Sequence, residues 1–150
     1  MNEIKIGYKA MRSYVGDCYE PLTEDGRIAN TYYTLNKETK QRKGSQGSFA
    51  VFDNLSNLYK FLRINKWLID RNSNSCNPEE YKVIIAKVEF VEEINGSLWC
   101  KIIGDIIIFD KKLPLGTIFA EMVKPIEIIS IIDKNGHELE NKEGDLQYCI

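Results

Sequence analysis

The sequence from Phe49 to Asp70 is FAVFDNLSNLYKFLRINKWLID, and it contains the clearest change from strand to helix in the chain. Its first four residues are apolar and fit a short buried strand, and Asp53 or Asn54 is a suitable N-cap for a following helix. Apolar side chains then recur at the 3.6-residue spacing of an amphipathic helix. The pattern predicts one main α-helix over about residues 54–70.

The segments on both sides of this helix have the alternation and β-branched content of strands. Residues 117–123 fit either a strand or a short helical turn, and Pro125 is expected to end that segment. Gly104, between two of the expected strands, is expected to form a bulge. Because no repeat or linker occurs, we expect a single α+β domain over residues 1–150, mostly an antiparallel sheet with the one main helix packed on it. The other strands expected cover residues 4–12, 14–22, 31–35, 49–52, 81–90, 98–103, 105–110, 126–132 and 137–139.

Charge and hydropathy exclude several classes of function. The chain has 20 Lys and Arg against 22 Asp and Glu, a net charge of −2. We therefore expect no broad binding to DNA or RNA, which requires a basic face. The most apolar region, residues 102–119, is interrupted by charges and Pro114, so it predicts strands and no membrane helix. The beginning of the chain lacks an apolar run of signal-peptide length, and we expect a cytoplasmic protein.

The residue types that usually hold metals are scattered. Cys18, Cys76, Cys100 and Cys149 include no Cys-x-x-Cys pair, and His137 is the only histidine. We expect reduced thiols, no metal site and no cofactor. His137 follows an Asn-Gly turn, where an exposed side chain is expected rather than a general base.

Residues 36–48 form a polar, glycine-containing segment that is expected to be a mobile loop. Its cations Lys40, Arg42 and Lys43 stand beside a glycine-rich backbone, a combination that can hold phosphate. The segment lacks P-loop spacing and does not lead directly into a helix. The alternative is a solvated charged loop. If the loop has a function, these three cations are its ligand-binding candidates.

Tyrosines are dense in the first third of the chain. If several share an exposed face, they form a surface suited to binding, because tyrosine offers a large contact area at low entropic cost. The alternative is an ordinary half-buried face of a sheet. Tyr14 and Tyr32 are the binding candidates of this set. Its members are Tyr8, Tyr14, Tyr19, Tyr32 and Tyr33.

Three segments of the chain follow one another in an order that also occurs in other proteins. They are Tyr8-Lys-Ala-Met-Arg12, Gly47-Ser-Phe-Ala-Val-Phe-Asp53 before the helix, and Phe119-Ala-Glu-Met-Val-Lys-Pro125. This order resembles small uncharacterised α+β proteins of bacteria and their phages. The abundance of Ile, Lys and Asn, whose codons are AT-rich, also indicates a low-GC genome.

The same layout is similar to that of the ADP-ribosyltransferases. That family places an Arg on the first strand, a Ser on a strand that enters a helix and a Glu on a late strand, all around NAD. The resemblance implies Arg12, Ser48 and Glu121 as catalytic residues. The chain departs from the family where Ser-Thr-Ser is replaced by Ser48-Phe-Ala, and where Phe119 stands in place of Gln or Glu.

No other constellation in the sequence supports catalysis. We therefore expect a small non-catalytic binding protein from a phage or other mobile element. Its expected partner is a host or defence protein, or a small nucleotide ligand that it sequesters. The alternative expectation is an ADP-ribosyltransferase-like enzyme that uses NAD.

Overall fold

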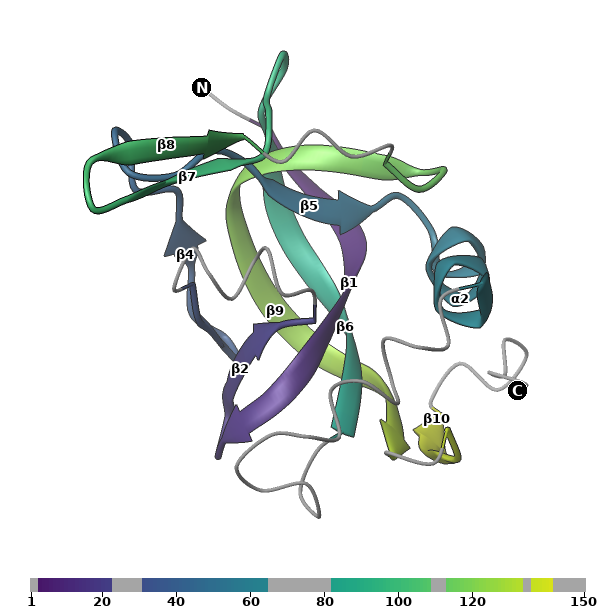
Figure 1. Ribbon diagram of the computed structural model, residues 1–150. Helices are drawn as coiled ribbons and strands as arrows, with labels where there is room; N and C mark the ends of the chain where they lie inside the picture. The colour runs from purple at the N-terminus through teal and green to yellow at the C-terminus, as the bar shows by residue number, and fades with distance from the viewer. Residues whose placement is uncertain (1–2, 23–30, 65–81, 109–112, 134–135, 142–150) are drawn as a thin grey trace.

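The computed structural model describes residues 3–22, 31–64, 82–108, 113–133 and 136–141. In these residues the chain is mostly antiparallel β-sheet, with a single short helix beside it (Figure 1). The elements in chain order are β1 (Ile4–Val15), β2 (Cys18–Pro21), β3 (Tyr33–Thr34), β4 (Thr39–Lys40), β5 (Phe49–Phe52), α2 (Leu55–Ile64), β6 (Lys82–Glu92), β7 (Trp99–Ile102), β8 (Asp105–Ile108), β9 (Thr117–Asp133) and β10 (Glu138–Asn141).

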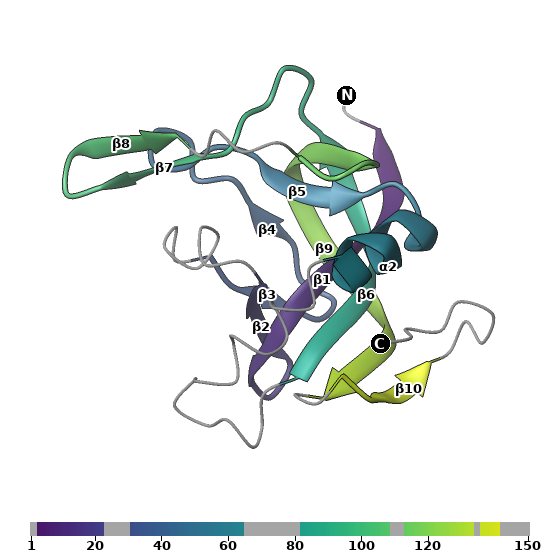
Figure 2. The ribbon, with the colours of Figure 1, turned by 45° about the vertical axis from the view of Figure 1, so that its right-hand side comes forward.

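The main sheet is built on three long strands, β1, β6 and β9. β6 pairs antiparallel with β1 on one side and with β9 on the other. The short β5 pairs with β9 over its whole length and with β1 through Tyr8 and Phe52. These four strands therefore form a closed circuit, and the long strands curve around its interior (Figures 1 and 2).

The remaining strands extend this circuit. β2 pairs with β1, and β3 with β2, while β4 and β10 pair with β9. β7 and β8 form a separate two-stranded sheet that projects from one end of the molecule (Figures 1 and 2).

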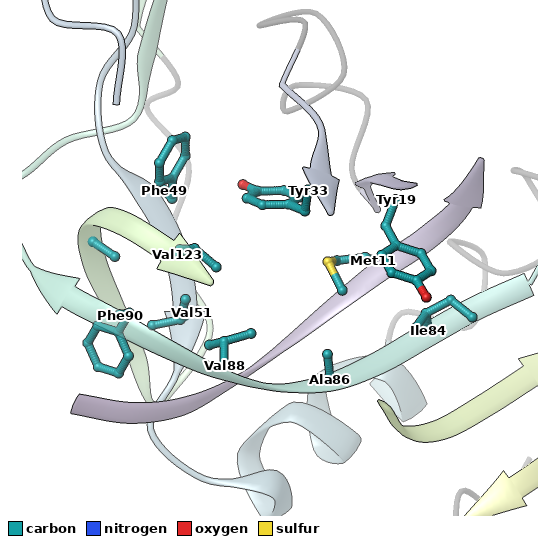
Figure 3. Packing of buried hydrophobic residues seen from close by; sticks show 11 residues of the cluster. Met11, Tyr19, Tyr33, Phe49, Val51, Ile84, Ala86, Val88, Phe90 and Val123 are labelled. Carbon is teal, nitrogen blue, oxygen red and sulfur yellow. The ribbon is translucent and has the colours of Figure 1, made fainter. Parts of the chain in front are cut away.

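One hydrophobic core fills the interior of the curved sheet (Figure 3). Alternate side chains of each strand point into this core, because successive side chains of a strand point to opposite faces of the sheet. Its members are Met11, Tyr19, Tyr33, Phe49, Val51, Ile84, Ala86, Val88, Phe90, Ala120 and Val123.

A second core lies between the outer face of the sheet and helix α2. The buried residues of the helix are Leu55, Leu58, Tyr59 and Leu62, at the spacing that the sequence predicts. They pack against Val83, Ile85, Ile129 and Ile132 of β6 and β9.

The helix is shorter in the described residues than the prediction of residues 54–70. Asn54 Oδ1 accepts a hydrogen bond from the backbone N–H of Asn57 at 2.9 Å, which confirms the predicted cap. The described helix has 10 residues, Leu55–Ile64, and residues 65–70 of the prediction lie outside the described part. The mostly antiparallel sheet is confirmed, but the chain is mostly β rather than α+β with a main helix.

The predicted end of a strand at Pro125 is wrong. β9 continues from Thr117 to Asp133 as one strand. Pro125 pairs with Val88, next to a shift of register between Lys87 and Val88. Because an irregularity of this kind already interrupts the ladder, a residue without an N–H is tolerated there.

Candidate functional site

The structure places the three residues that the transferase resemblance implies in β1, directly before β5 and in β9. Arg12 is near the end of β1, where its Nε lies 3.5 Å from Glu20 Oε2. Glu121 is in β9, opposite the part of β6 that pairs with the beginning of β1 at Ile4. Ser48 precedes β5, which pairs with the same end of β9. An extended strand rises about 3.3 Å per residue, so Arg12 is roughly 26 Å along β1 from Ile4, the end that lies across β6 from Glu121, whereas β5 approaches β1 at Tyr8, which pairs with Phe52.

The contacts of Ser48 connect neighbouring parts of the fold. Its side chain is buried, its Oγ donates a hydrogen bond to the carboxylate of Glu93, and the N–H of Ser97 donates to the same Oγ at 3.1 Å. Its backbone N–H also donates to Ser97 O at 2.8 Å. Ser48 therefore joins the beginning of β5 to the segment that leads into β7. The sequence contains no local signal for Glu93 as its partner, because 45 residues separate them.

The basic segment from residue 36 to residue 48 contains regular hydrogen-bonded structure. Lys40 is in β4, where it pairs with Met122, and its Nζ lies 3.8 Å from Glu38 Oε2. Arg42 and Lys43 are exposed at the turn that follows. The three cations are thus placed on one segment, and one of them is beside a carboxylate.

Two glutamines hold this segment from within. Gln46 is buried, and its Nε2 donates to Thr31 Oγ1 at 2.8 Å while its Oε1 accepts from the N–H of Arg42 at 3.1 Å. Gln41 donates through its backbone N–H to Glu121 O at 2.8 Å. Hydrogen bonds therefore connect this segment to β9 and also connect residues within the segment.

The tyrosines do not share one exposed face in the described residues. Tyr19 and Tyr33 are buried in the inner core, and Tyr8 packs on the outer one. Tyr32 is 44% exposed, and its carbonyl oxygen accepts a hydrogen bond from Thr39 Oγ1. Tyr14 is in β1, but its side chain lies outside the described part of the structure. These positions favour the alternative in which the tyrosines belong to an ordinary half-buried face of the sheet.

Lys9 is the most unusual ionisable residue in the described part of the chain. Its side chain points into the inner core, where Nζ donates to Ala50 O at 2.6 Å and lies 5.0 Å from the centre of the Tyr33 ring. Burial lowers the pKa of Lys9 to about 8, and burial also raises the pKa of Tyr33 above its ordinary value. The amine is thus held by a carbonyl oxygen and an aromatic ring.

The β7–β8 hairpin is fixed firmly to the sheet at its base. The segment of residues 45–47 runs antiparallel to β7, with hydrogen bonds of 2.8 Å from Gly47 N–H to Trp99 O and from Lys101 N–H to Ser45 O. Cys100 is buried at this contact. A Cβ on Gly47 would lie 2.3 Å from Ser97 O and 2.4 Å from Trp99 Cδ1, so only glycine fits there. The hairpin is therefore a fixed projection.

The projecting part of this hairpin is apolar and exposed. Every residue of β8 is exposed, and Ile106, Ile107 and Ile108 are 64%, 39% and 69% exposed. Sequence reasoning placed these residues in a strand, but it did not identify them as a surface. An unbroken apolar run is typical of a buried strand, and only the charges of Lys101 and Asp105 beside it point to solvent.

The tip of the hairpin is a two-residue turn in which both residues have positive φ. Ile103 has φ of 49° and Gly104 has φ of 85°, the values of a type I′ turn. Gly104 is therefore a turn residue, and the predicted bulge is wrong. Ile103 is 98% exposed, and a β-branched residue with positive φ is a conformational outlier.

Metal-binding and nucleophilic groups do not converge in the described residues. They contain no group of three or more His, Cys, Asp or Glu side chains placed to hold a metal ion. Cys18 and Cys100 are free thiols, while Cys76 and Cys149 lie outside the described part. His137 is exposed at the predicted turn, and its Nδ1 lies 3.7 Å from Asp133 Oδ2.

Comparison of the chain with protein-family models, with curated proteins and with solved structures finds no match. Among the described residues, no helix has the length and apolar character needed to cross a membrane.

Proposed function

We propose that this chain is a non-catalytic protein-binding domain and that the β7–β8 hairpin is its contact element. The observation that carries the proposal is the exposure of Ile103, Ile106, Ile107 and Ile108 on one anchored projection. Large exposed apolar groups that gather in one place mark interaction surfaces, whereas single ones are ordinary.

The tip of the hairpin supports this role. Positive φ favours Asn or Gly, and at another turn the chain has Asn95 with φ of 63°. At Ile103 a similar positive φ of 49° occurs at a β-branched residue whose side chain is 98% exposed. Neither turn formation nor core packing benefits from this side chain, so a contact with another molecule accounts for it best.

The anchoring of the hairpin supports the same role. A contact element that is fixed before binding loses little conformational entropy when it binds. Hydrogen bonds from residues 45–47 to β7, and from Ser48 to Ser97, fix the base of the hairpin. The partner in this proposal is a protein with an apolar surface, and a host or defence protein of a bacterium fits that description.

The test compares four forms of the full chain. The first is the wild type, and the second carries Ile106→Lys and Ile108→Lys on the hairpin. The matched control carries Ile64→Lys and Ile94→Lys, which replace isoleucines 70% and 80% exposed outside the hairpin. The fourth carries Ile103→Asn, which suits the turn conformation and is expected to raise stability by about 1 kcal/mol.

Proteins captured from a bacterial lysate by the wild type and the control, but not by the hairpin variant, are identified, purified and titrated against all four forms. We expect dissociation constants at least about 30-fold weaker for the hairpin variant, as for residues that dominate an interface. Ile103→Asn should weaken binding while it stabilises the fold, which separates a lost contact from unfolding. Equal affinity of purified partners for the hairpin variant and the control would contradict the proposal.

A further inference from the structure

The two edges of the β7–β8 hairpin differ in their backbone partners. On the β7 edge, Trp99 O accepts from Gly47 N–H and Lys101 N–H donates to Ser45 O, both at 2.8 Å. On the other edge, none of the described strands pairs with β8 apart from β7 itself. Within the part of the chain that the structure describes, the hairpin therefore has one occupied edge and one open edge (Figure 2).

The register of the hairpin identifies the backbone groups on the open edge. Trp99 and Lys101 direct hydrogen-bonding groups away from β8, so their partners Ile108 and Ile106 belong to non-hydrogen-bonded pairs. The N–H and C=O groups of Ile106 and Ile108 consequently point outward from β8. Those of Ile107 point toward β7, because the direction alternates along a strand.

Building on the proposed role of the hairpin in protein recognition, we propose that β8 pairs antiparallel with β8 of a second copy of this chain. One symmetric register uses all the outward groups of Ile106 and Ile108. In it, Ile106 of each copy lies opposite Ile108 of the other, and the two Ile107 residues face each other across the two-fold axis. The two hairpins then form one four-stranded sheet.

A second copy fits this edge better than an unrelated strand, because the edge is complementary to itself. Ile106, Ile107 and Ile108 face only isoleucine in the symmetric register, and no charged side chain faces a like charge. Proteins usually prevent such pairing with an edge Lys, a Pro or a bulge, and β8 has none of these over these three residues.

The pairing also gives the hairpin a more stable sheet. Residues 45–47 support β7 only near the base of the hairpin, and a sheet of three or more strands with an apolar face is more stable in water than one of two strands. Ile106 and Ile108 project on the same face of β8, so two copies place four isoleucines next to one another on one side. The two Ile107 side chains meet on the opposite side.

The interface is expected to be weak. A contact of two three-residue strands and their side chains is at the small end of protein interfaces, below about 1,200 Å² of total buried area. We expect an equilibrium between monomer and dimer with a dissociation constant of about 10 micromolar or weaker. The dimer is therefore populated only at high concentration, or when a bound partner protein holds the two copies together.

Disulfide trapping tests the register directly. In a full-length background with Cys18→Ser, Cys76→Ser, Cys100→Ala and Cys149→Ser, single cysteines are placed at residues 106, 107 and 108. Opposed Cβ atoms in a non-hydrogen-bonded pair are about 4.5–5.5 Å apart, so Ile107→Cys should form a disulfide-linked dimer under mild oxidation. Ile106→Cys and Ile108→Cys alone should form at least about 10-fold less, and the two combined should restore the dimer.

Sedimentation of the wild type provides a second measurement that needs no substitution. The average mass should rise from 17.3 kDa toward twice that value as concentration increases. The Ile106→Lys and Ile108→Lys variant should remain a monomer, and the Ile64→Lys and Ile94→Lys control should follow the wild type.

A wild type that stays monomeric up to about 1 millimolar, or equal disulfide yields at residues 106, 107 and 108, would overturn the pairing. If another purified protein still loses affinity for the hairpin variant, the proposed function stands without the second copy. If the hairpin substitutions change neither self-association nor any other binding, both proposals fall.

Discussion

Lys9 shows how one residue can oppose the stability of the fold that surrounds it. Its side chain is 8% exposed, and its ammonium group is held by Ala50 O and the face of the Tyr33 ring. Removing a charge from water costs free energy, and burial accordingly lowers the pKa of Lys9 to about 8 from 10.5. In the folded chain at neutral pH, the protonated amine is therefore destabilising relative to the unfolded chain.

The sign of the pH dependence follows from these two values. Between about pH 8 and pH 10.5 the unfolded chain retains the Lys9 proton that the folded chain has released. The free energy of unfolding should consequently rise with pH across this window. The raised pKa of Tyr33 has the opposite effect on the free energy of unfolding. Above pH 10.0, the ordinary pKa of tyrosine, the unfolded chain ionises this residue before the folded chain does, so the free energy of unfolding should fall as pH rises.

We expect Lys9→Met to stabilise the protein at pH 7 by roughly 2 kcal/mol. The shift in pKa corresponds to roughly 3 kcal/mol, and the lost hydrogen bond to Ala50 O offsets about 1 kcal/mol. Urea unfolding from about pH 7 to pH 9.5, below the titration of tyrosine, should show a flatter profile for the variant than for the wild type. Lys60→Met, which removes an exposed lysine of α2, is the control. An unchanged pH profile in Lys9→Met would contradict the assignment.

At the scale of elements, the β7–β8 hairpin depends on the segment of residues 45–47 that lies beside it. Gly47 is at the closest point, with no space for a Cβ between Ser97 O and the Trp99 ring. The hairpin can stay in its observed position only while this backbone contact is preserved.

Gly47→Ala should therefore displace the hairpin and destabilise the fold by about 2–3 kcal/mol, because backbone and a large ring must both move. Gly44→Ala is the control, since Gly44 has φ of 88° but open space around its Cβ position. It should cost about 1 kcal/mol from conformation alone. Chemical unfolding measures the difference, and faster amide exchange in β7 and β8 should accompany it only in Gly47→Ala. Similar losses in both variants would show that the contact is unimportant.

The sequence predicts most strands but not their surroundings. Alternation and β-branched content identify β1, β6 and β9, and the cap at Asn54 locates the beginning of α2. The course of β9 through Pro125 depends on a register shift between β6 and β9, a non-local feature that no local pattern contains. The apolar run of β8 is likewise typical of a buried strand, and only the neighbouring charges of Lys101 and Asp105 indicate that it lies outside the core.

At the scale of the whole molecule, the curved sheet separates residues that the sequence analysis grouped. The succession of strands along the chain was largely predicted, but their order in the sheet was not, and the distance between sites depends on register. β1 is paired with β6 along nearly its full length, and β6 with β9, so position along β1 determines which residues of β9 are near. A motif spread over three strands can be judged only when that register is known.

The placement of Arg12 and Glu121 leads to a prediction about NAD. Arg12 is paired with Glu20 near one end of β1, and Glu121 lies across β6 from the other end, roughly 26 Å away along an extended strand, while the Ser48 side chain is engaged by Glu93 and Ser97. A transferase would need these groups around one nicotinamide ribose, so we expect no release of nicotinamide from NAD above the uncatalysed rate. Glu121→Gln should leave both this background and the affinity of the hairpin for its partner unchanged. Nicotinamide release that Glu121→Gln abolishes would restore the enzymatic alternative, and it would require a different arrangement of β1 and β9.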